Sequence, residues 1–155
     1  MERKVSESRI EQVYQVRPEH LNGAGRLFGG RLMEWIDEIA ALVGIRHSQC
    51  NVITASVDNL EFIRGVYQKD LIVLIGNITY VGNTSMEIRV DTYVEQLDGT
   101  RYPVNRAYLT LVAIDSQGKP TKVPGLLIES VGQQAEWEAG KKRKELRIQR
   151  KKEGF

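Results

Sequence analysis

Asp37 is the residue whose type and surroundings point most directly to chemistry. It is a carboxylate inside an otherwise apolar helical pattern, and a carboxylate beside a buried helix face costs free energy unless it is paired or used. Carboxylates in such positions concentrate at catalytic sites, where they accept a proton from water or attack as nucleophiles. The alternative is a structural role, in which Asp37 pairs with a buried arginine or a backbone donor.

A glycine-rich turn precedes this helical pattern and could bind a developing negative charge. Four glycines fall within eight residues: Gly23, Gly25, Gly29 and Gly30. Backbone N–H groups at a helix N-terminus favour negative charge, and glycine lets a reacting group approach closely. The Gly30 N–H is therefore the candidate oxyanion donor, although Gly-Gly also suits a simple turn into a helix. Asn22 can donate and accept hydrogen bonds at such a site, or serve only the turn itself.

The element that must position Asp37 is a helix expected from about Gly30 to Arg46. Apolar residues recur along it at steps of three and four: Leu32, Ile36, Ile39 and Val43. Apolar side chains cover more than half of its circumference, so other structure must wrap it. Asp37 lies at the margin of the buried face rather than on the open polar side.

Strand-forming residues dominate the chain on both sides of this helix. One strand is expected over residues 10–17. Four longer strands follow, over residues 52–63, 71–81, 86–94 and 102–114. Short turn signals separate the four, which predicts an antiparallel meander. No segment of helix length lies between them, so a parallel βαβ sheet is not expected.

A final helix is expected over residues 131–152. Ser130 is a favoured N-cap residue, and Gln133 follows at the spacing of a capping box. The order of elements therefore predicts an α+β fold, in which a five-stranded antiparallel sheet wraps the long central helix and a C-terminal helix is added. We expect one folded domain over residues 1–130 and a basic helical tail over 131–155.

Composition narrows the class of protein further. No segment approaches the ~20 apolar residues of a membrane span, and the first residues lack the apolar core of a secretory signal. Cys50 is the only cysteine, which excludes an intramolecular disulfide and fits a reducing compartment. One cysteine and two histidines are too few soft ligands for a typical zinc site. We therefore expect a cytoplasmic protein with no membrane partner and no metal.

The formal net charge of +2 conceals a strongly basic segment. Residues 140–155 hold eight Lys and Arg against two Glu, a formal +6, which leaves −4 for the rest of the chain. A basic segment can bind nucleic acid or anionic ligands, but such a run is more often the solvated end of a helix. We expect the second, so nucleic acid is not an expected partner.

The order of elements and several motifs resemble the hotdog-fold acyl-CoA thioesterases, in the branch of the bacterial YciA-like enzymes and the brain-type acyl-CoA hydrolases. The signature of that branch stands here as Asn22 to Gly30, followed by Leu32-Met33 and Asp37. The resemblance covers roughly residues 10–125. It continues through Asp58-Asn59-Leu60-Glu61-Phe62, Gly82-Asn83-Thr84-Ser85 and Val112 to Pro120.

This resemblance implies an acyl-CoA hydrolase that releases coenzyme A and a carboxylic acid, with coenzyme A as part of the substrate and no separate cofactor. It implies at least a homodimer, assembled into a trimer of dimers, whose sheets join and whose active sites form at the interface. Each site would take Asp37 from one subunit and Asn22 from the other, with the Gly30 N–H as oxyanion donor. Asp37 would act as general base on water or as nucleophile, and both mechanisms stay open.

The coenzyme A arm would run through a groove between the subunits, where basic groups meet its phosphates. The residues expected to contact it are Phe28, Gly29, Arg64, Thr84, Ser85, Lys119 and Lys122. Each of them also has a plain alternative, as a surface charge or a turn residue.

Two other functions stay open. Hotdog hydratases and dehydratases pair a His with an Asp or Glu, so His20 with Asp37 keeps an enoyl-CoA hydratase in view, although the His-Phe-Pro type of motif is absent. The second is a non-enzymatic acyl-CoA-binding protein. The other histidine, His47, follows the helix and is expected to cap its C-terminus.

Overall fold

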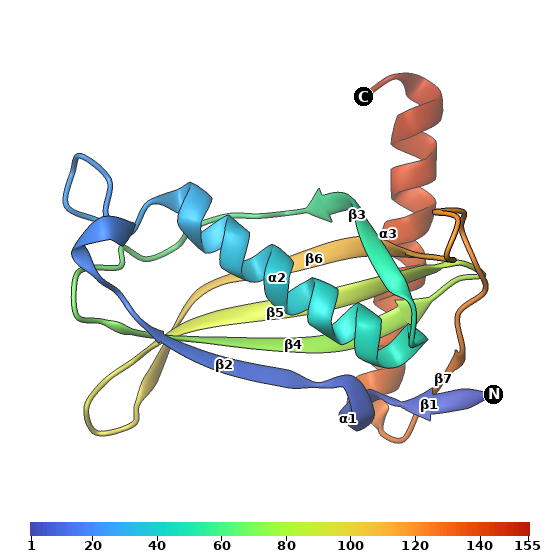
Figure 1. Cartoon of the computed structure of the whole chain (residues 1–155), viewed down its shortest axis with the longest axis horizontal. Coiled ribbons are helices and arrows are strands. Elements are labelled where there is room, and N and C mark those ends of the chain that lie inside the picture. The colour runs from blue at the N-terminus through green and yellow to red at the C-terminus, as the bar shows by residue number, and fades with distance from the viewer.

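The long helix α2 (Gly29–Ser48) lies along one face of a five-stranded antiparallel sheet (Figure 1). The computed structural model describes residues 1–155. In the order in which they are hydrogen-bonded, the strands are β2 (Ile10–Gln15), β4 (Leu71–Val81), β5 (Ser85–Glu95), β6 (Arg101–Ile114) and β3 (Asn51–Asp58). The predicted α+β architecture, a sheet wrapped around a long helix, is thereby confirmed.

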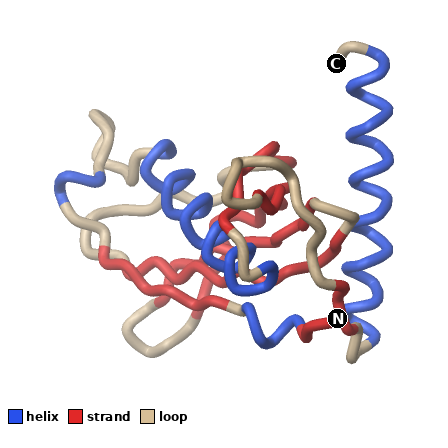
Figure 2. Tube along the Cα trace, turned by 45° about the vertical axis from the view of Figure 1, so that its right-hand side comes forward, coloured by secondary structure: helices blue, strands red, loops and turns tan.

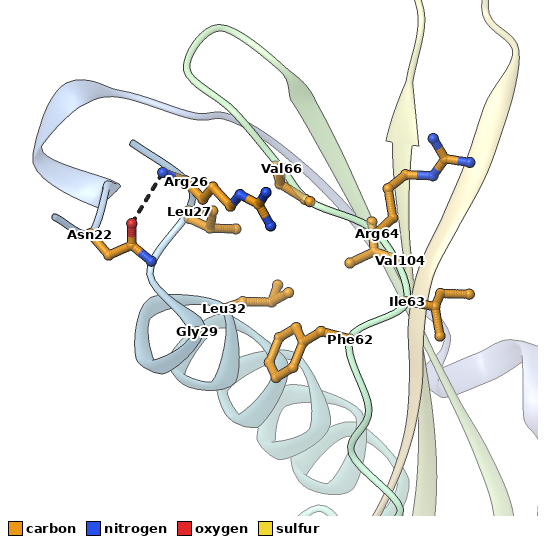
Figure 3. A pocket seen from close by; sticks show the side chains of 11 residues that line it. Asn22, Arg26, Leu27, Gly29, Leu32, Phe62, Ile63, Arg64, Val66 and Val104 are labelled. Atoms are coloured by element: carbon orange, nitrogen blue, oxygen red, sulfur yellow. Dashed lines mark hydrogen bonds between the residues drawn. The ribbon is translucent and has the colours of Figure 1, made fainter. Parts of the chain in front are cut away.

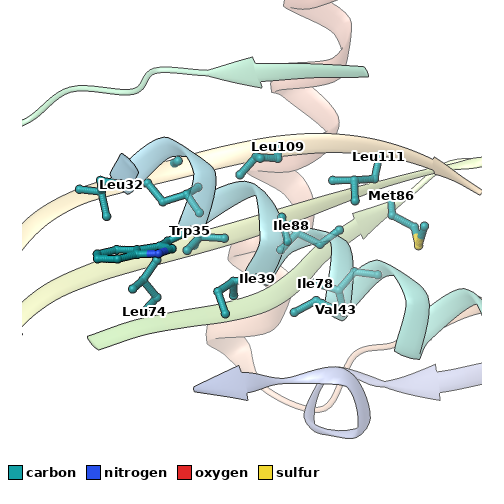
Figure 4. Packing of buried hydrophobic residues seen from close by; sticks show 14 of the residues in the cluster. Leu32, Trp35, Ile39, Val43, Leu74, Ile78, Met86, Ile88, Leu109 and Leu111 are labelled. Atoms are coloured by element: carbon teal, nitrogen blue, oxygen red, sulfur yellow. The ribbon is translucent and has the colours of Figure 1, made fainter. Parts of the chain in front are cut away.

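The apolar stripe of α2 is buried against the sheet (Figure 4). Four of its side chains are at most 1% exposed, as their spacing predicted: Leu32, Ile36, Ile39 and Val43. Gly76 on β4 permits the close approach, because a Cβ there would lie 2.8 Å from Ile39 Cγ2. Burial of each large apolar side chain contributes ~1.5–3 kcal/mol relative to exposure, so this face fixes the helix on the sheet.

The predicted meander is wrong in one respect, because β3 does not neighbour β4. β2 occupies the outer edge of β4, so β3 pairs with β6 at the opposite edge of the sheet. The predicted strand 52–63 also ends early, at Asp58. Residues 59–70 form the connection that carries the chain from the edge strand β3 across the sheet to β4, the neighbour of the opposite edge strand. We call residues 59–70 the crossing loop.

The second long helix, α3 (Val131–Glu153), crosses the opposite face of the sheet, and its C-terminal end projects beyond it (Figures 1 and 2). Ser130 Oγ accepts a hydrogen bond of 3.1 Å from the Gln133 N–H, which confirms the predicted N-cap. Gly140 permits close contact with β4, because a Cβ there would lie 2.8 Å from Tyr80 Cβ. No helix of the chain combines the length and hydropathy that crossing a membrane requires.

The basic segment of α3 is not wholly solvated, which corrects the expectation. Arg143 donates two hydrogen bonds of 2.9 Å to Glu87, a β5 carboxylate that is 4% exposed. Arg147 and Arg150 donate to Asp58, at 3.1 and 3.2 Å. No local pattern in the sequence shows which carboxylates of a sheet face a second helix. The run of basic residues therefore predicted only that this part of α3 is exposed to solvent.

β3 contains a one-residue bulge at Ala55. Thr54 and Asp58 are four residues apart, whereas their partners on β6, Leu111 and Tyr108, are three apart. Residues four apart in a regular strand point to the same face, but an extra residue reverses that alternation. Thr54 therefore faces α2, and Asp58 faces α3.

The N-terminal segment adds elements that the sequence patterns did not indicate. β1 (Glu2–Lys4) and α1 (Val5–Ser8) precede β2, and the short 3-10 helix η1 (Pro18–His20) follows it. β1 pairs in parallel with β7 (Gly125–Leu127), and the two form a separate small sheet. β1, α1 and β7 lie at the end of the sheet near the C-terminal end of α2 (Figure 1). η1 lies elsewhere, directly before the glycine-rich turn.

His47 is fully buried, so its predicted role as a helix cap is wrong. Its Nε2–H donates a hydrogen bond of 2.9 Å to Pro124 O, just before β7. Burial lowers the pKa of the imidazole below its ordinary value of 6.5, and the hydrogen bond to Pro124 only partly opposes this. The helix instead ends at Gln49, which adopts the left-handed conformation with φ of 59°.

Candidate active site

A cavity of about 360 Å³ opens beside the N-terminal end of α2 (Figure 3). Its wall combines the glycine-rich turn, the first turns of α2, the crossing loop and one residue of β6. The lining residues are Asn22, Arg26, Leu27, Gly29, Leu32, Phe62, Ile63, Arg64, Gly65, Val66 and Val104. This mixed apolar and cationic wall suits a ligand that has both apolar and anionic parts.

The side chain of Asn22 organises the turn before α2. Its Oδ1 accepts hydrogen bonds from the backbone N–H groups of Ala24 and Arg26, at 2.9 and 3.1 Å. The residue is exposed at the cavity, so its Nδ2 can still donate to a ligand. The geometry therefore accommodates both sequence-based interpretations of Asn22, the turn residue and the site donor.

Two glycines open α2, and no backbone carbonyl accepts the N–H of Gly29 or Gly30. Free donors at a helix N-terminus favour negative charge. Gly29 lines the cavity, whereas Gly30 faces the ring of Phe28, where a Cβ would lie 2.6 Å from Phe28 Cε2. Gly29 is therefore as good a candidate for the oxyanion donor as Gly30.

Asp37 lies further along α2 and is held by β3. Its Oδ1 accepts a hydrogen bond of 2.6 Å from Thr54 Oγ1. The carboxylate is exposed in the single chain rather than buried under the sheet, because β3 is an edge strand and no further strand covers it. At 1.5 Å per residue, Asp37 lies about 12 Å from Gly29 along the helix axis. One subunit thus does not bring Asp37 into the cavity with Asn22.

Thr54 is a residue of this site that sequence reasoning missed. The residue types around it predict a strand, but none of them distinguishes one hydroxyl from another. Its position opposite Asp37 depends on the pairing of β3 with β6 and on the bulge at Ala55. Both features are non-local, so no signal within the segment could have identified Thr54.

The side of β3 that faces away from β6 is unpaired and partly apolar. Ile53 and Val57 on this strand are 52% and 43% exposed, and Met33 on α2 is 46% exposed. An open edge strand with apolar side chains is a template for pairing with another chain. The bond between Asp37 and Thr54 therefore lies at an edge of the molecule that is suited to a partner.

Arg64 and Gly29, two of the predicted coenzyme A contacts, line the cavity. The Arg64 guanidinium lies 4.9 Å from the centroid of the Tyr102 ring and points away from the apolar wall (Figure 3). Arg26, which sequence reasoning missed, lines the same cavity with its guanidinium 5.7 Å from the Tyr67 ring. Two permanently charged guanidinium groups beside one cavity favour an anionic ligand.

The remaining predicted coenzyme A contacts do not line this cavity. Phe28 precedes α2 and stays more than half exposed. Four others lie near the C-terminal end of α2, at the start of β5 or in the segments between strands: Thr84, Ser85, Lys119 and Lys122. α2 has 20 residues and a length of about 30 Å, so one subunit does not bring these four to Gly29.

His20, the residue behind the alternative hydratase reaction, is engaged elsewhere. Its Nδ1 accepts a hydrogen bond of 3.0 Å from the Arg17 N–H, and its ring packs edge-on against Trp35 with 5.0 Å between the centroids. It makes no hydrogen bond to Asp37, so one subunit does not assemble the His–Asp pair of a hydratase. The chain also contains no group of three His, Cys, Asp or Glu side chains that could share one metal ion.

Sequence comparison places the chain among known thioester hydrolases. Residues 24–99 match the family described as the Thioesterase superfamily. The chain is 39% identical over 125 residues to YkhA, an uncharacterised acyl-CoA thioester hydrolase of Bacillus subtilis, and covers 73% of it with 80% of its own length. It is 34% identical over 154 residues to the cytosolic acyl coenzyme A thioester hydrolase of Rattus norvegicus, but spans only 40% of that longer protein.

Solved structures agree with this similarity. An acyl-CoA hydrolase from Staphylococcus aureus, in complex with butyryl coenzyme A, coenzyme A and coenzyme A disulfide, matches with a TM-score of 0.93 and 32% identity. The match covers 99% of this chain and 94% of that one, and therefore includes α3. An apo-hexameric acyl-CoA thioesterase matches with a TM-score of 0.92 and 36% identity over 96% of both chains.

Alanine variants of the Staphylococcus aureus enzyme provide a further comparison. Three have been solved, with an asparagine, an aspartate and a threonine replaced. The three positions are separated by 15 and 17 residues, and the same two intervals separate Asn22, Asp37 and Thr54. With the family match, the shared fold and this common spacing, the chain belongs to the Thioesterase superfamily, among its acyl-CoA thioester hydrolases.

Proposed function

We propose that this chain hydrolyses acyl-CoA thioesters to free coenzyme A and a carboxylic acid, at a site completed by a second copy of the chain. The observation that carries the proposal is the bond between Asp37 and Thr54, which lies at the open edge of β3. In the same subunit the backbone donors of Gly29 are about 12 Å away along α2. A second subunit whose Asn22 and Gly29 lie at this edge would supply the hydrogen-bond donors that Asp37 lacks in its own subunit.

Pairing of β3 with β3 of a second copy would join the two sheets and cover Ile53 and Val57. In this proposal Asp37 of one subunit meets the glycine-rich turn of the other, and the two-fold axis repeats the contact, so each dimer has two sites. Asn22 and Gly29 would then serve the neighbour's carboxylate. Similarity to hexameric thioesterases supports further assembly into a trimer of dimers, and a relative named as cytosolic supports a cytoplasmic location.

Asp37 would act as general base in this site. It removes a proton from a water molecule whose oxygen attacks the thioester carbonyl carbon. The C–S bond then breaks, and the proton passes from the Asp37 carboxyl group to the coenzyme A thiolate. In the alternative route, Asp37 attacks the carbonyl carbon itself, the C–S bond breaks and coenzyme A leaves as a thiolate. Water then hydrolyses the resulting anhydride to the carboxylic acid and free Asp37, and a proton from that water passes to the thiolate. Thr54 occupies Oδ1, which leaves Oδ2 for either route.

The other groups would bind the reacting parts of the substrate. N–H groups of Gly29 and Gly30 would stabilise the oxyanion of the tetrahedral intermediate. Asn22 Nδ2 would orient the carbonyl group or the attacking water. Arg26 and Arg64 would attract the phosphates of coenzyme A to the cavity. Only coenzyme A, as part of the substrate, is needed for this chemistry.

The test is thiol release from a panel of acyl-CoA substrates of graded chain length, measured for wild type, Asp37→Ala and Glu38→Ala. Wild type should release thiol, and Asp37→Ala should lose activity by at least about 100-fold, as expected when a general base is removed. Glu38→Ala is the matched control, because it removes the neighbouring exposed carboxylate of α2. Full activity in Asp37→Ala would overturn the proposal, and loss of enoyl-CoA absorbance without thiol release would establish a hydratase instead.

A further inference from the structure

We infer that Asp58 is a positioning residue of the thioesterase site, through which α3 holds the crossing loop at the substrate cavity. The inference rests on the proposed function for its effect on substrate binding. Asp58 is the last residue of β3, and its side chain is 12% exposed. Its two oxygens lie 3.1 Å from Arg147 Nη1 and 3.2 Å from Arg150 Nη2.

The chain leaves the sheet directly after Asp58. Asn59 adopts the left-handed conformation with φ of 54°, so the backbone changes direction there. The next backbone hydrogen bond of the crossing loop is the one that the Ile63 N–H donates to Val104 O, at 3.0 Å. Asp58 therefore fixes one end of the segment 59–63, which has no backbone hydrogen bond of its own before Ile63.

The crossing loop forms one wall of the cavity. Phe62 to Val66 line it, and the Phe62 ring projects toward the first turn of α2 (Figure 3). A Cβ on Gly29 would lie 3.7 Å from the Phe62 ring, so the loop approaches the candidate oxyanion donor closely. At its far end the loop is held by the hydrogen bond of 2.7 Å from the Leu27 N–H to Val66 O. A displacement of the segment that begins at Asp58 would therefore change the width of the cavity.

α3 is a firm anchor for this contact, because Arg143 ties it to the middle of the sheet. Both hydrogen bonds from Arg143 reach the buried Glu87, which also accepts a bond of 2.6 Å from Thr79 Oγ1. The Arg143 guanidinium lies 3.6 Å from the Tyr108 ring centroid. Charge-assisted bidentate bonds and a close cation–π contact keep the helix in one position on the sheet.

The bulge in β3 separates this contact from the catalytic one. Thr54 faces α2 and holds Asp37, whereas Asp58 faces α3. Loss of the Asp58 contact should therefore weaken substrate binding at the cavity and leave the Asp37–Thr54 bond in place. The expected kinetic effect is a higher KM with kcat nearly unchanged.

A different role for the two arginines would be direct binding of a coenzyme A phosphate. The two roles predict opposite changes of KM in Asp58→Asn. If Arg147 binds phosphate, Asp58→Asn frees it and lowers KM, while Arg147→Gln raises KM. If Asp58 positions the loop, both substitutions raise KM: Arg147→Gln, which breaks one of the two ion pairs, by about fivefold, and Asp58→Asn, which breaks both, by at least as much. The double variant Asp58→Asn/Arg147→Gln should show little rise beyond Asp58→Asn alone, because Asp58→Asn already removes the ion pair that Arg147 makes. Lys151→Gln is the control, since it removes one exposed charge of α3 that makes no ion pair.

Amide hydrogen exchange supplies a readout that does not depend on activity. In Asp58→Asn, the amides of residues 59–63 should exchange faster than in wild type, whereas those of the central strands should not change. If Asp58→Asn does not fold, Arg150→Gln removes the more exposed partner and should show the same effects at smaller size. An inactive wild type would refute the proposed function but leave the exchange experiment valid. Unchanged KM and exchange, or a lowered KM in Asp58→Asn, would overturn the inference.

Discussion

Thr54 Oγ1 donates a hydrogen bond of 2.6 Å to Asp37 Oδ1, and this bond joins the edge strand β3 to the central helix α2. A carboxylate with one oxygen occupied in this way is fixed in orientation and keeps its second oxygen for chemistry. Hydrogen bonds to charged groups are stronger than those between neutral groups, so Thr54 contributes to the position of Asp37 as well as to the fold.

We predict that Thr54→Val lowers kcat by at least about tenfold, because a hydrogen bond to a charged group is worth ~1.5–3 kcal/mol and valine has the same shape without the hydroxyl. Thr54→Ser keeps the donor and should stay close to wild type. Steady-state thiol release at saturating acyl-CoA measures both variants. Equal rates for Thr54→Val and Thr54→Ser would show that the hydroxyl is not needed.

A site shared by two subunits predicts complementation between inactive variants. Dimers that contain one Asp37→Ala chain and one Asn22→Ala chain have one intact site and one doubly defective site. With random pairing of equal amounts, about a quarter of the wild-type activity should return. Co-expression of the two chains in equal amounts, purification of all dimers through one tag carried by both chains, and a thiol assay measure this recovery.

The control pair for complementation is Asp37→Ala with Thr54→Val. Both residues belong to the same half of the site, so every mixed dimer keeps two defective sites, and the activity should stay at the average of the two parent variants with no gain from mixing. Recovery in this control, or none in the first pair, would contradict a site divided between Asn22 and Asp37.

We predict that Gly140→Ala destabilises the protein by ~1–3 kcal/mol, as overpacking does, because the new Cβ would lie 2.8 Å from Tyr80 Cβ. Gly132→Ala on the same helix is the matched control. Its Cβ meets only Ser130 Oγ, at 3.9 Å, so the change should be neutral or stabilise by up to ~1 kcal/mol. Urea unfolding at one fixed protein concentration measures both. Equal stability of the two variants would mean that α3 does not need the close contact with β4.

The buried His47 predicts a loss of stability in mild acid. Burial lowers the pKa of the imidazole in the folded chain below 6.5, so between these two values the unfolded chain binds more protons than the folded one. The free energy of unfolding therefore falls as the pH drops below about 6.5 and levels off below the folded pKa. His47→Gln keeps a donor for Pro124 O and removes the titration. Unfolding curves between pH 5 and 7 should show a smaller loss in His47→Gln, and an equal loss would assign the effect to other groups.

Much of the fold follows from local periodicity. The apolar steps from Leu32 to Val43 located α2 to within two residues at either end, and β4 spans the same residues as its predicted strand. Such signals are carried by neighbouring residues, so sequence reasoning can detect them. The position of β3 is different, because it depends on whether β2 or β3 takes the free edge of β4. That competition is decided by the whole sheet and not by the residues of β3.

The residues of the candidate site also fall into two groups, those that a local motif indicates and those that only the folded chain brings together. Asn22 and Asp37 stand in a continuous motif and could be singled out from the sequence, and their roles remain predictions. Thr54 and Arg26 reach the site only through the pairing of β3 and the closure of the crossing loop over α2, so no local pattern indicated them. The contact of Arg147 with Asp58 joins residues 89 positions apart. The local run of basic residues does not predict which distant carboxylate Arg147 contacts.

The bulge at Ala55 makes the length of β3 as important as its composition. An in-frame deletion of this one alanine would leave every named site residue in the gene and still restore a regular alternation. In the shortened strand Thr54 and Asp58 are three residues apart, so they still point to opposite faces and each keeps its own helix. A strand that kept all eight residues but lost the bulge would instead turn both side chains toward one helix, so the number of residues between Thr54 and Asp58 decides which helix each one contacts.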